Sequence, residues 1–431
     1  MDTDKTGTAA VILSGNLGDD ATKTSMNENA LALTRSLGRQ GVPVYRFHPD
    51  RSLTDLASRF CVHVPCPNLY SDPAALVDAL VSFAESSSRR PVLFPASDGA
   101  AQFIADHEEQ LGGHFAFTSP PAAIIRNTQN KRRLLETAGP AGIPVPETYF
   151  PDAATRLQDI AQRIAYPAVV KPVYSPDWKR PEITQAFGRV KALRLTGPEE
   201  LVGTCRKLLS LASEFMVQEI IPGPTENLFT FIGYMDHEGN VLTGCVRKKI
   251  RQFPPGFGYC ASTESVADEE VRNLAIALFK ALNYSGIGCA EFKRDPRDGK
   301  TKLIEINTRA VRTSALAIAA GADFPWVAYR DAVAPGSVQP DLACRVPVLW
   351  IHLRDEIRSA GMMMLRGELS PLTWIRGFFG KPIVVAEFSW DDMKPGLLLW
   401  AQIPVRLIQN LAERLLRLFR PATMHASETK K

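Results

Sequence analysis

The first hundred residues alternate short apolar runs with amphipathic segments, and this order constrains the fold more than any other feature of the chain. Residues 9–13 predict a buried strand, residues 27–38 an amphipathic helix and residues 42–47 a second strand. The pattern repeats with a helix over 74–85 and a short strand over 91–95. Such alternation is typical of an open α/β sheet, so the chain is expected to begin with a βα array.

Polar residues follow the strand predicted over 91–95, at the edge where open parallel sheets usually bind ligands. Asp98 lies in this polar tip. Two interpretations stay open for Asp98: a ligand contact, or the cap of a helix that runs to Gln110. Residues 15–18 invite a dinucleotide site, but the Gly-x-Gly-x-x-Gly order and the acidic residue that should follow it are absent. A nicotinamide cofactor is therefore not expected.

The pattern changes near residue 118, where prolines punctuate the chain and strands begin to dominate. A helix is predicted over 130–138, and the expected strands are 168–171, 215–218, 228–234, 241–248, 288–293 and 302–307. After Pro335 the chain becomes rich in tryptophan and proline, and residues 404–420 predict an amphipathic helix. We therefore expect an α/β domain over 1–117, an α+β domain over 118–335 and a C-terminal tail over 336–431.

The composition of the chain excludes several classes of protein. Lys and Arg number 50 against 46 Asp and Glu, and the net charge of +4 argues against a nucleic-acid partner and favours small molecules. The seven cysteines are scattered without a Cys-x-x-Cys pair, which argues against disulfides and structural zinc and favours a reducing compartment. The N-terminus lacks the features of a signal peptide, and no apolar run reaches the ~18 residues of a spanning helix. A cytoplasmic protein is expected.

Residues 288–307 are the most informative stretch for chemistry, because they predict a β-hairpin with a polar loop. The strand period of two places Glu305 and Asn307 together on one face. It places Ile304 and Ile306 on the opposite, buried face. Two oxygen-bearing side chains are thus expected to project from the same side of the second strand.

Glu291 lies on the first strand of this hairpin, and counting back across the loop brings it within about one residue of facing Glu305. Two carboxylates and the amide oxygen of Asn307 would then converge, and a divalent cation would relieve the repulsion between the acids. Oxygen ligands with few protein donors suit Mg²⁺ that is shared with substrate phosphates. The alternative is an exposed hairpin whose acids pair with Lys302 and Arg309.

Two lysines and one strand end add to this prediction. Lys171 ends an apolar strand and Lys131 opens a helix, and both positions suit a phosphate; the alternatives are a snorkelling edge lysine and a solvated first turn. Residues 215–223 lead from a strand into a turn, where backbone groups can pair with an adenine edge while Ile221 packs on the ring. The alternative is an ordinary strand end. Glu226 can accept from ribose hydroxyls or face water.

The order and spacing of these pieces resembles the ATP-grasp superfamily of carboxylate–amine ligases. The resemblance covers about residues 118–334, and its most specific parts are the paired lysines and the Glu-x-Asn-x-Arg ending at 305–309. It implies a two-lobed ATP-grasp domain that follows an N-terminal domain similar to the fold usually found before it. It also implies that the protein uses ATP and Mg²⁺.

The resemblance implies a role for each matching residue. The implied ATP contacts are Lys131, Lys171, Gln218, Glu219, Ile221 and Glu226. The implied Mg²⁺ ligands are Glu291, Glu305 and Asn307. The implied catalytic residues are Lys171 and Arg309, with Arg312 as a second candidate to face developing negative charge.

One departure from the family pattern follows Lys171. Residues 172–181 contain no glycine, which argues against the usual glycine-rich flap over the phosphates and leaves Lys179 or Arg180 to supply charge.

The function that the resemblance implies is ATP-dependent ligation: a small-molecule carboxylate is activated as an acyl-phosphate and joined to an amine, with release of ADP and phosphate. The alternative is a non-catalytic ATP-binding regulatory or scaffold protein. Two interpretations stay open for the helix predicted over 404–420. Its apolar side can pack on protein, either the chain's own core or a second subunit, or the helix can lie on an anionic membrane.

Overall fold

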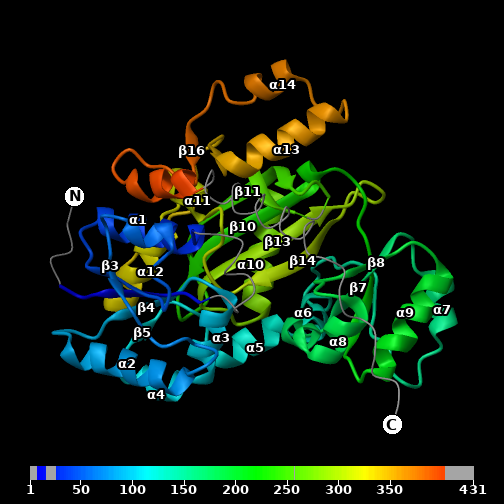
Figure 1. Ribbon diagram of the computed structural model, residues 1–431, viewed down its shortest axis with the longest axis horizontal. Coiled ribbons are helices and arrows are strands. Elements are labelled where there is room, and N and C mark those ends of the chain that lie inside the picture. The colour runs from blue at the N-terminus through cyan, green and yellow to red at the C-terminus, as the bar shows by residue number, and fades with distance from the viewer. Residues whose placement is uncertain (1–6, 16–25, 257, 403–431) are drawn as a thin grey trace, which may run out of the picture.

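The computed structural model describes residues 7–15, 26–256 and 258–402, and it arranges the strands in three sheets. Figure 1 shows a blue N-terminal α/β array, a green lobe that projects to one side, and a large sheet between them. The expected mixed α/β architecture is confirmed.

The N-terminal sheet has five parallel strands in the order β3-β2-β1-β4-β5. Its strands are β1 Ala10–Leu13, β2 Val44–Phe47, β3 Val62–Val64, β4 Val92–Pro95 and β5 Ala116–Phe117. Its helices are α1 Glu28–Arg39, α2 Pro73–Ser86, α3 Asp98–Asp106 and α4 Glu108–Gly112. Alternate residues of β1 enter two different cores, because Ile12 packs with Leu33 of α1 whereas Val11 packs with Leu76 of α2. Both faces of the sheet are therefore covered, and the predicted βα array is confirmed.

The smaller lobe contains a four-stranded sheet in the order β6-β9-β7-β8 with antiparallel pairs. Its strands are β6 Thr148–Tyr149, β7 Ala168–Pro172, β8 Leu193–Leu195 and β9 Phe215–Glu219. The helices of this lobe are α7 Leu157–Arg163, α8 Pro181–Phe187 and α9 Pro198–Ser210, with a 3₁₀ turn η2 Ser175–Lys179. Two helices precede the lobe: α5 Ala122–Gln129 packs on α3, and α6 Lys131–Ala138 packs in the core of the large sheet. Ile160 of α7 and Leu208 of α9 pack on one face of this sheet with Val217 of β9.

The large sheet has seven strands in the order β14-β13-β10-β11-β12-β15-β16. Its strands are β10 Leu228–Met235, β11 Val241–Phe253, β12 Tyr259–Ser265, β13 Gly286–Arg294, β14 Thr301–Asn307, β15 Leu349–Ile351 and β16 Ile383–Val385. The helices beside it are α10 Glu269–Ala281, α11 Ser314–Ala319 and α12 Phe324–Val333, and the 3₁₀ turn η3 Thr225–Asn227 precedes β10. One core cluster joins Ile12 of the N-terminal sheet to Ile232 and Trp350 of this sheet.

The C-terminal part of the chain is built into the rest of the molecule. It supplies β15 and β16 to the large sheet, together with α13 Leu353–Leu365 and α14 Pro371–Arg376. Farther on, Asp392 returns to α1 and forms a buried ion pair with Arg35 at 2.9 Å. The boundaries expected at 117 and 335 stay predictions, and the helix predicted over 404–420 lies outside the described residues.

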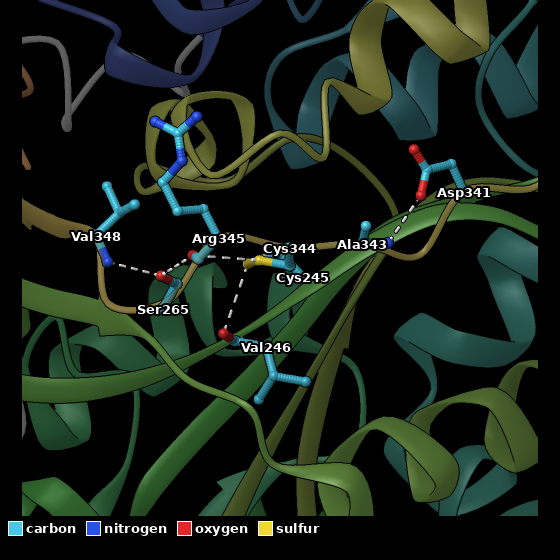
Figure 2. Close-up of a disulfide and its surroundings, with 8 residues drawn as sticks. All are labelled: Cys245, Val246, Ser265, Asp341, Ala343, Cys344, Arg345 and Val348. Carbon is cyan, nitrogen blue, oxygen red and sulfur yellow. Dashed lines mark hydrogen bonds between the residues drawn. A yellow bond between two sulfur atoms is a disulfide. The ribbon is translucent and has the colours of Figure 1, made fainter.

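Two cysteines correct the expectation of a fully reduced set. Cys245 of β11 and Cys344 form a disulfide with a Cα–Cα distance of 5.8 Å (Figure 2). The bond joins residues 99 positions apart, which is why their spacing in the sequence gave no sign of it. Among the described residues no helix is both long and apolar enough to span a bilayer.

Candidate active site

The hairpin of β13 and β14 brings the two predicted acids face to face. Glu291 is the direct partner of Glu305 in the antiparallel register, and Cys289 is the partner of Asn307. The expected facing of Glu291 and Glu305 is thus confirmed. The polar loop between the strands turns at Gly299, whose φ of +71° favours glycine.

The prediction for the opposite face of β14 is partly wrong. The register shifts beside Glu291, so Phe292 pairs with Leu303 and Ile304 has no paired residue in the ladder. Leu303 is fully buried in the core beside α10, Ile306 packs against the same core, and Ile304 is only half-buried. A bulge therefore gives Leu303 the buried place that strict alternation assigned to Ile304.

The two facing carboxylates repel each other. Burial by the surrounding protein raises the pKa of Glu305 and the Glu291 carboxylate raises it further, although the Glu305 side chain itself reaches solvent. Asn307 Nδ2 donates to Glu305 Oε1 at 3.3 Å, and Lys249 Nζ lies 3.8 Å from Glu291 Oε1. Two carboxylates with an amide form a donor set that fits Mg²⁺ when phosphates and water complete the shell.

The alternative partners proposed for these acids are wrong. Lys302 Nζ instead contacts Asp295 Oδ2 at 2.8 Å and Glu219 Oε1 at 3.0 Å. Arg309 pairs with an aspartate at the start of helix α3. In the part of the chain that the structure describes, no group of three or more His, Cys, Asp or Glu side chains is placed to hold a metal, so the ligand set here has two acids only.

Both predicted phosphate lysines face these acids. Lys171 of β7 donates from Nζ to Gln218 Oε1 at 3.1 Å, and Lys131, the first residue of α6, donates from Nζ to Ser175 Oγ at 3.0 Å. Burial lowers the pKa of both lysines, while the Glu305 carboxylate acts in the opposite direction on each. The structure thus gathers two desolvated cations opposite two like-charged acids, as a site for a metal-bound polyphosphate requires.

Arg309 is held by Asp98, which the sequence offered as a ligand contact or a helix cap. Ser97 is the actual N-cap of α3, with its Oγ accepting from Ala100 N at 3.1 Å, so the capping interpretation of Asp98 is wrong. Arg309 Nε and Nη2 donate to the two carboxylate oxygens of Asp98 at 2.7 and 2.8 Å. The surrounding protein opposes ionisation of Asp98, although the Asp98 side chain itself reaches solvent. The Arg309 guanidinium, with Lys191 and Lys179 beyond it, nevertheless holds the pKa of Asp98 below its usual range.

Arg312, the second candidate to face developing negative charge, is already paired with other residues. Its Nη2 donates to Asp355 Oδ2 at 2.8 Å and to Glu28 Oε1 at 3.2 Å, and its Nη1 donates to the Cys260 carbonyl. Glu28 also lies 3.1 Å from His352 Nε2. Arg312 therefore ties α1 to the start of α13, and Arg309 is the one of these two arginines on which the Glu305 carboxylate acts.

The predicted adenine hinge ends β9. The Glu219 carboxylate accepts from Glu147 N and Lys302 Nζ, each at 3.0 Å, and also pairs with Arg297. Ile221 is buried, and its carbonyl accepts from Lys293 Nζ at 2.7 Å. The Glu219 side chain thus braces the hinge, so only backbone groups there suit an adenine edge, and the nucleotide contacts stay predictions.

The two remaining predicted ATP contacts, Gln218 and Glu226, differ in what their side chains contact. Gln218 bridges the small lobe, since it accepts from Lys171 and its Nε2 donates to Thr148 Oγ1 at 2.9 Å. Glu226 is exposed in η3.

The segment after β7 forms η2 and α8 in place of a glycine-rich flap. Trp178 is buried and donates from Nε1 to Ser213 Oγ at 3.2 Å. Arg180 donates to the Leu211 carbonyl at 2.8 Å, so it does not supply charge to the phosphates. Lys179 does act on the site, because it lowers the pKa of Asp98.

Sequence reasoning missed several residues of this site. Lys249 and Lys293 lie on strands beside the acids, but nothing in their local sequence distinguishes them from other strand lysines. Lys191, between α8 and β8, donates to the Tyr259 hydroxyl of β12 at 3.0 Å and lies over its ring at 5.2 Å. This contact joins the small lobe to the large sheet.

Known proteins match both the sequence and the fold. The family model for the ATP-binding domain of the carbamoyl-phosphate synthase L chain matches residues 199–336, which hold the hinge and the acids but not the two lysines. A D-aspartate ligase from Enterococcus faecium (strain Aus0004) is 24% identical over 259 residues. That match covers 58% of this chain and 61% of the relative.

Solved structures share the fold. An L-amino acid ligase from Bacillus licheniformis matches with a TM-score of 0.54 and 19% identity, covering 77% of each chain. The biotin carboxylase domain of the Hydrogenobacter thermophilus 2-oxoglutarate carboxylase, solved with MgADP and bicarbonate, matches with a TM-score of 0.55 and 17% identity. That match covers 78% of this chain and 72% of the other.

Proposed function

We propose that this chain is an ATP-grasp carboxylate–amine ligase, which phosphorylates a substrate carboxylate with ATP and joins the acyl group to an amine. The matches to the family model, the D-aspartate ligase and the L-amino acid ligase support this proposal. The observation that carries this proposal is the cluster of Lys131 and Lys171 opposite Glu291 and Glu305, with Arg309 beside it. A protein that needed no catalysis could lose such a metal-binding face, so the facing acids favour turnover over binding alone.

The residues of the cluster divide the work. Glu291, Glu305 and Asn307 would hold Mg²⁺, which neutralises charge on the phosphates as the γ-phosphoryl group is transferred. Lys131 and Lys171 would bind phosphate oxygens, and their partial burial makes each charge count for more than it would in water. The MgADP complex of the biotin carboxylase neighbour supports this use of nucleotide and metal.

The reaction needs no protein nucleophile. An oxygen of the substrate carboxylate attacks the γ-phosphorus, and the bond from that phosphorus to ADP breaks. The amine nitrogen then attacks the acyl carbon, inorganic phosphate leaves with the electron pair of the broken C–O bond, and the nitrogen loses a proton. Rate comes from positioning and from charge fixed in advance, chiefly that of Arg309.

Asp98 supplies a clue to how the acid binds. Its carboxylate makes the two-pronged contact with Arg309 that a substrate carboxylate would make. We infer that the substrate acid displaces Asp98 from Arg309. Amino acids are the acids and amines to try first, because the ligases of E. faecium and B. licheniformis carry them in their names.

The test is nucleotide turnover with pooled substrates. Purified protein with Mg²⁺ and ATP should release ADP and phosphate only when a suitable acid is present, and product should form only when an amine is added. AMP and pyrophosphate as products would contradict the acyl-phosphate route. ATP binding without turnover for any pool, in a protein that melts cooperatively, would favour the regulatory alternative.

A further inference from the structure

Exposed apolar side chains gather on one part of the molecule, residues 353–383, here called the α13–α14 arm. Among the described residues thirteen large hydrophobic side chains are exposed, and the arm holds six of them: Ile357, Leu365, Leu372, Ile375, Phe379 and Ile383. Leu365 is 91% exposed and Phe379 72%. Single exposed apolar residues are ordinary, whereas a gathered set marks an interaction surface.

Helix α13 buries polar residues and exposes apolar ones, which is the reverse of the pattern expected of a surface helix. Its buried residues are Asp355, Glu356, Ser359 and Ala360. Its exposed residues include Ile357 and Leu365, which lie eight positions apart and so share a face. The buried Glu356 carboxylate accepts from Arg251 Nε at 2.6 Å and from Trp374 Nε1 at 3.0 Å. Polar contacts therefore anchor the arm to the body and leave apolar side chains facing outward.

Helix α14 has no buried residue. Figure 1 shows it as the outermost element at one end of the molecule, beyond α13. Trp374 and Phe378 meet edge to face at 5.3 Å, next to the exposed Phe379. Aromatic and aliphatic side chains without a core beneath them are typical of segments that insert into a membrane interface.

The charge around these side chains indicates which kind of partner binds the α13–α14 arm. The exposed charged side chains of the arm are Arg358, Arg366 and Arg376 against the single acid Glu368. Lys381 is paired with Glu264, and the acids Asp355 and Glu356 are buried. A second copy of the chain would bring the same arginines against each other, at a cost in repulsion. An anionic lipid surface would attract them and accept the apolar side chains.

We propose that the α13–α14 arm docks this protein peripherally on an anionic bilayer. The sequence that follows has the same character, since residues 404–420 alternate leucines with arginines, but those residues lie outside the described part of the chain. The proposal stands apart from the proposed ligase activity, because the arm contains none of the residues assigned to ATP, metal or substrate.

The test is flotation of the full chain with vesicles. The protein should float with vesicles of phosphatidylcholine mixed with phosphatidylglycerol, much less with phosphatidylcholine alone, and less as salt rises. The double variant Leu365→Ser and Phe379→Ser should lose about tenfold or more of its binding, because it removes two anchoring side chains. The control Val62→Ser, at an exposed apolar residue of β3, should float like the parent. All three should melt alike, since the changed side chains are exposed.

Three results would overturn the proposal. In the first, the double variant floats as well as the parent. In the second, the parent fails to float and sedimentation shows a dimer that the double variant dissociates, so a second copy covers the arm. In the third, a chain ending at residue 402 floats while the full chain does not, so the protein's own tail covers the arm.

Discussion

Replacement of Asp98 by asparagine tests whether the substrate acid must compete for Arg309. Asparagine keeps the size of the side chain and removes its charge. The lost pair is two-pronged at 2.7 and 2.8 Å, but the Asp98 side chain is 67% exposed, so solvent screens much of the attraction. A screened pair of this kind contributes about 1 kcal/mol, which corresponds to about a fivefold change in an equilibrium constant.

The expected result is therefore a selective change in KM. In an ADP-release assay with the acid varied, Asp98→Asn should lower the KM for the acid about fivefold and leave kcat close to that of the parent. The matched control is Asp106→Asn, which removes an exposed aspartate at the other end of α3, 3.4 Å from Arg126 and outside the site. Both variants should melt near the parent, because a charge in the first or last turn of a helix contributes only about 0.3–1 kcal/mol.

The opposite result would refute the displacement argument. A higher KM for the acid, with the control unchanged, would mean that Asp98 binds the substrate itself, for example through an amino group. A loss of kcat at unchanged KM would mean that Asp98 positions Arg309 during phosphoryl transfer. Either outcome would leave the ligase proposal intact, because that proposal rests on the lysines and the facing acids.

Three further predictions concern the hairpin. Glu305→Gln should abolish Mg²⁺-dependent ADP release while the melting temperature stays level or rises, since it removes repulsion with Glu291; normal turnover would place the metal elsewhere. Leu303→Asp should unfold the domain by placing a charge in the core, whereas Ile304→Asp at the bulge should be mild; equal melting would disprove the bulge. The pKa of Glu305 lies above the ordinary 4.5. As the pH is lowered, turnover should therefore start to fall at a higher pH than it would if Glu305 had an ordinary pKa. Without metal, neutral Glu305 should stabilise the folded protein below pH 4.5. This stabilisation should be lost as the pH rises through the raised pKa of Glu305.

The sequence predicted the parts of the fold whose cause is local. The βα alternation of the N-terminal sheet and the hairpin partner of Glu305 follow from side-chain periodicity and a short loop, and both were found. The bulge at Ile304 was missed because strict alternation of side chains assumes that both strands have the same number of residues, with none extra on either. The disulfide was missed because nothing local relates Cys245 to Cys344.

The site was predictable to the same extent. Lys131 and Lys171 stand at element ends, where a charged residue after or before an apolar run is conspicuous. Arg309 was predicted as a catalytic residue, but its pairing with Asp98, 211 positions away in the sequence, was not predicted. Lys249 projects from the middle of a strand with other basic residues beside it, so only the fold reveals that it faces Glu291.

The contacts across the site explain where substrate choice is expected to reside. Asp98–Arg309 joins the N-terminal sheet to the large sheet, and Lys191–Tyr259 joins the small lobe to the same sheet. The residues proposed to hold phosphate and metal could serve any acid, because they would touch only the nucleotide in the proposed reaction. In the proposed reaction an entering acid would displace Asp98, whose pKa the charges of Lys191 and Lys179 also lower. The residues that discriminate among acids are therefore expected at the carboxyl edge of the N-terminal sheet, where β4 meets α3, and not in the nucleotide cluster.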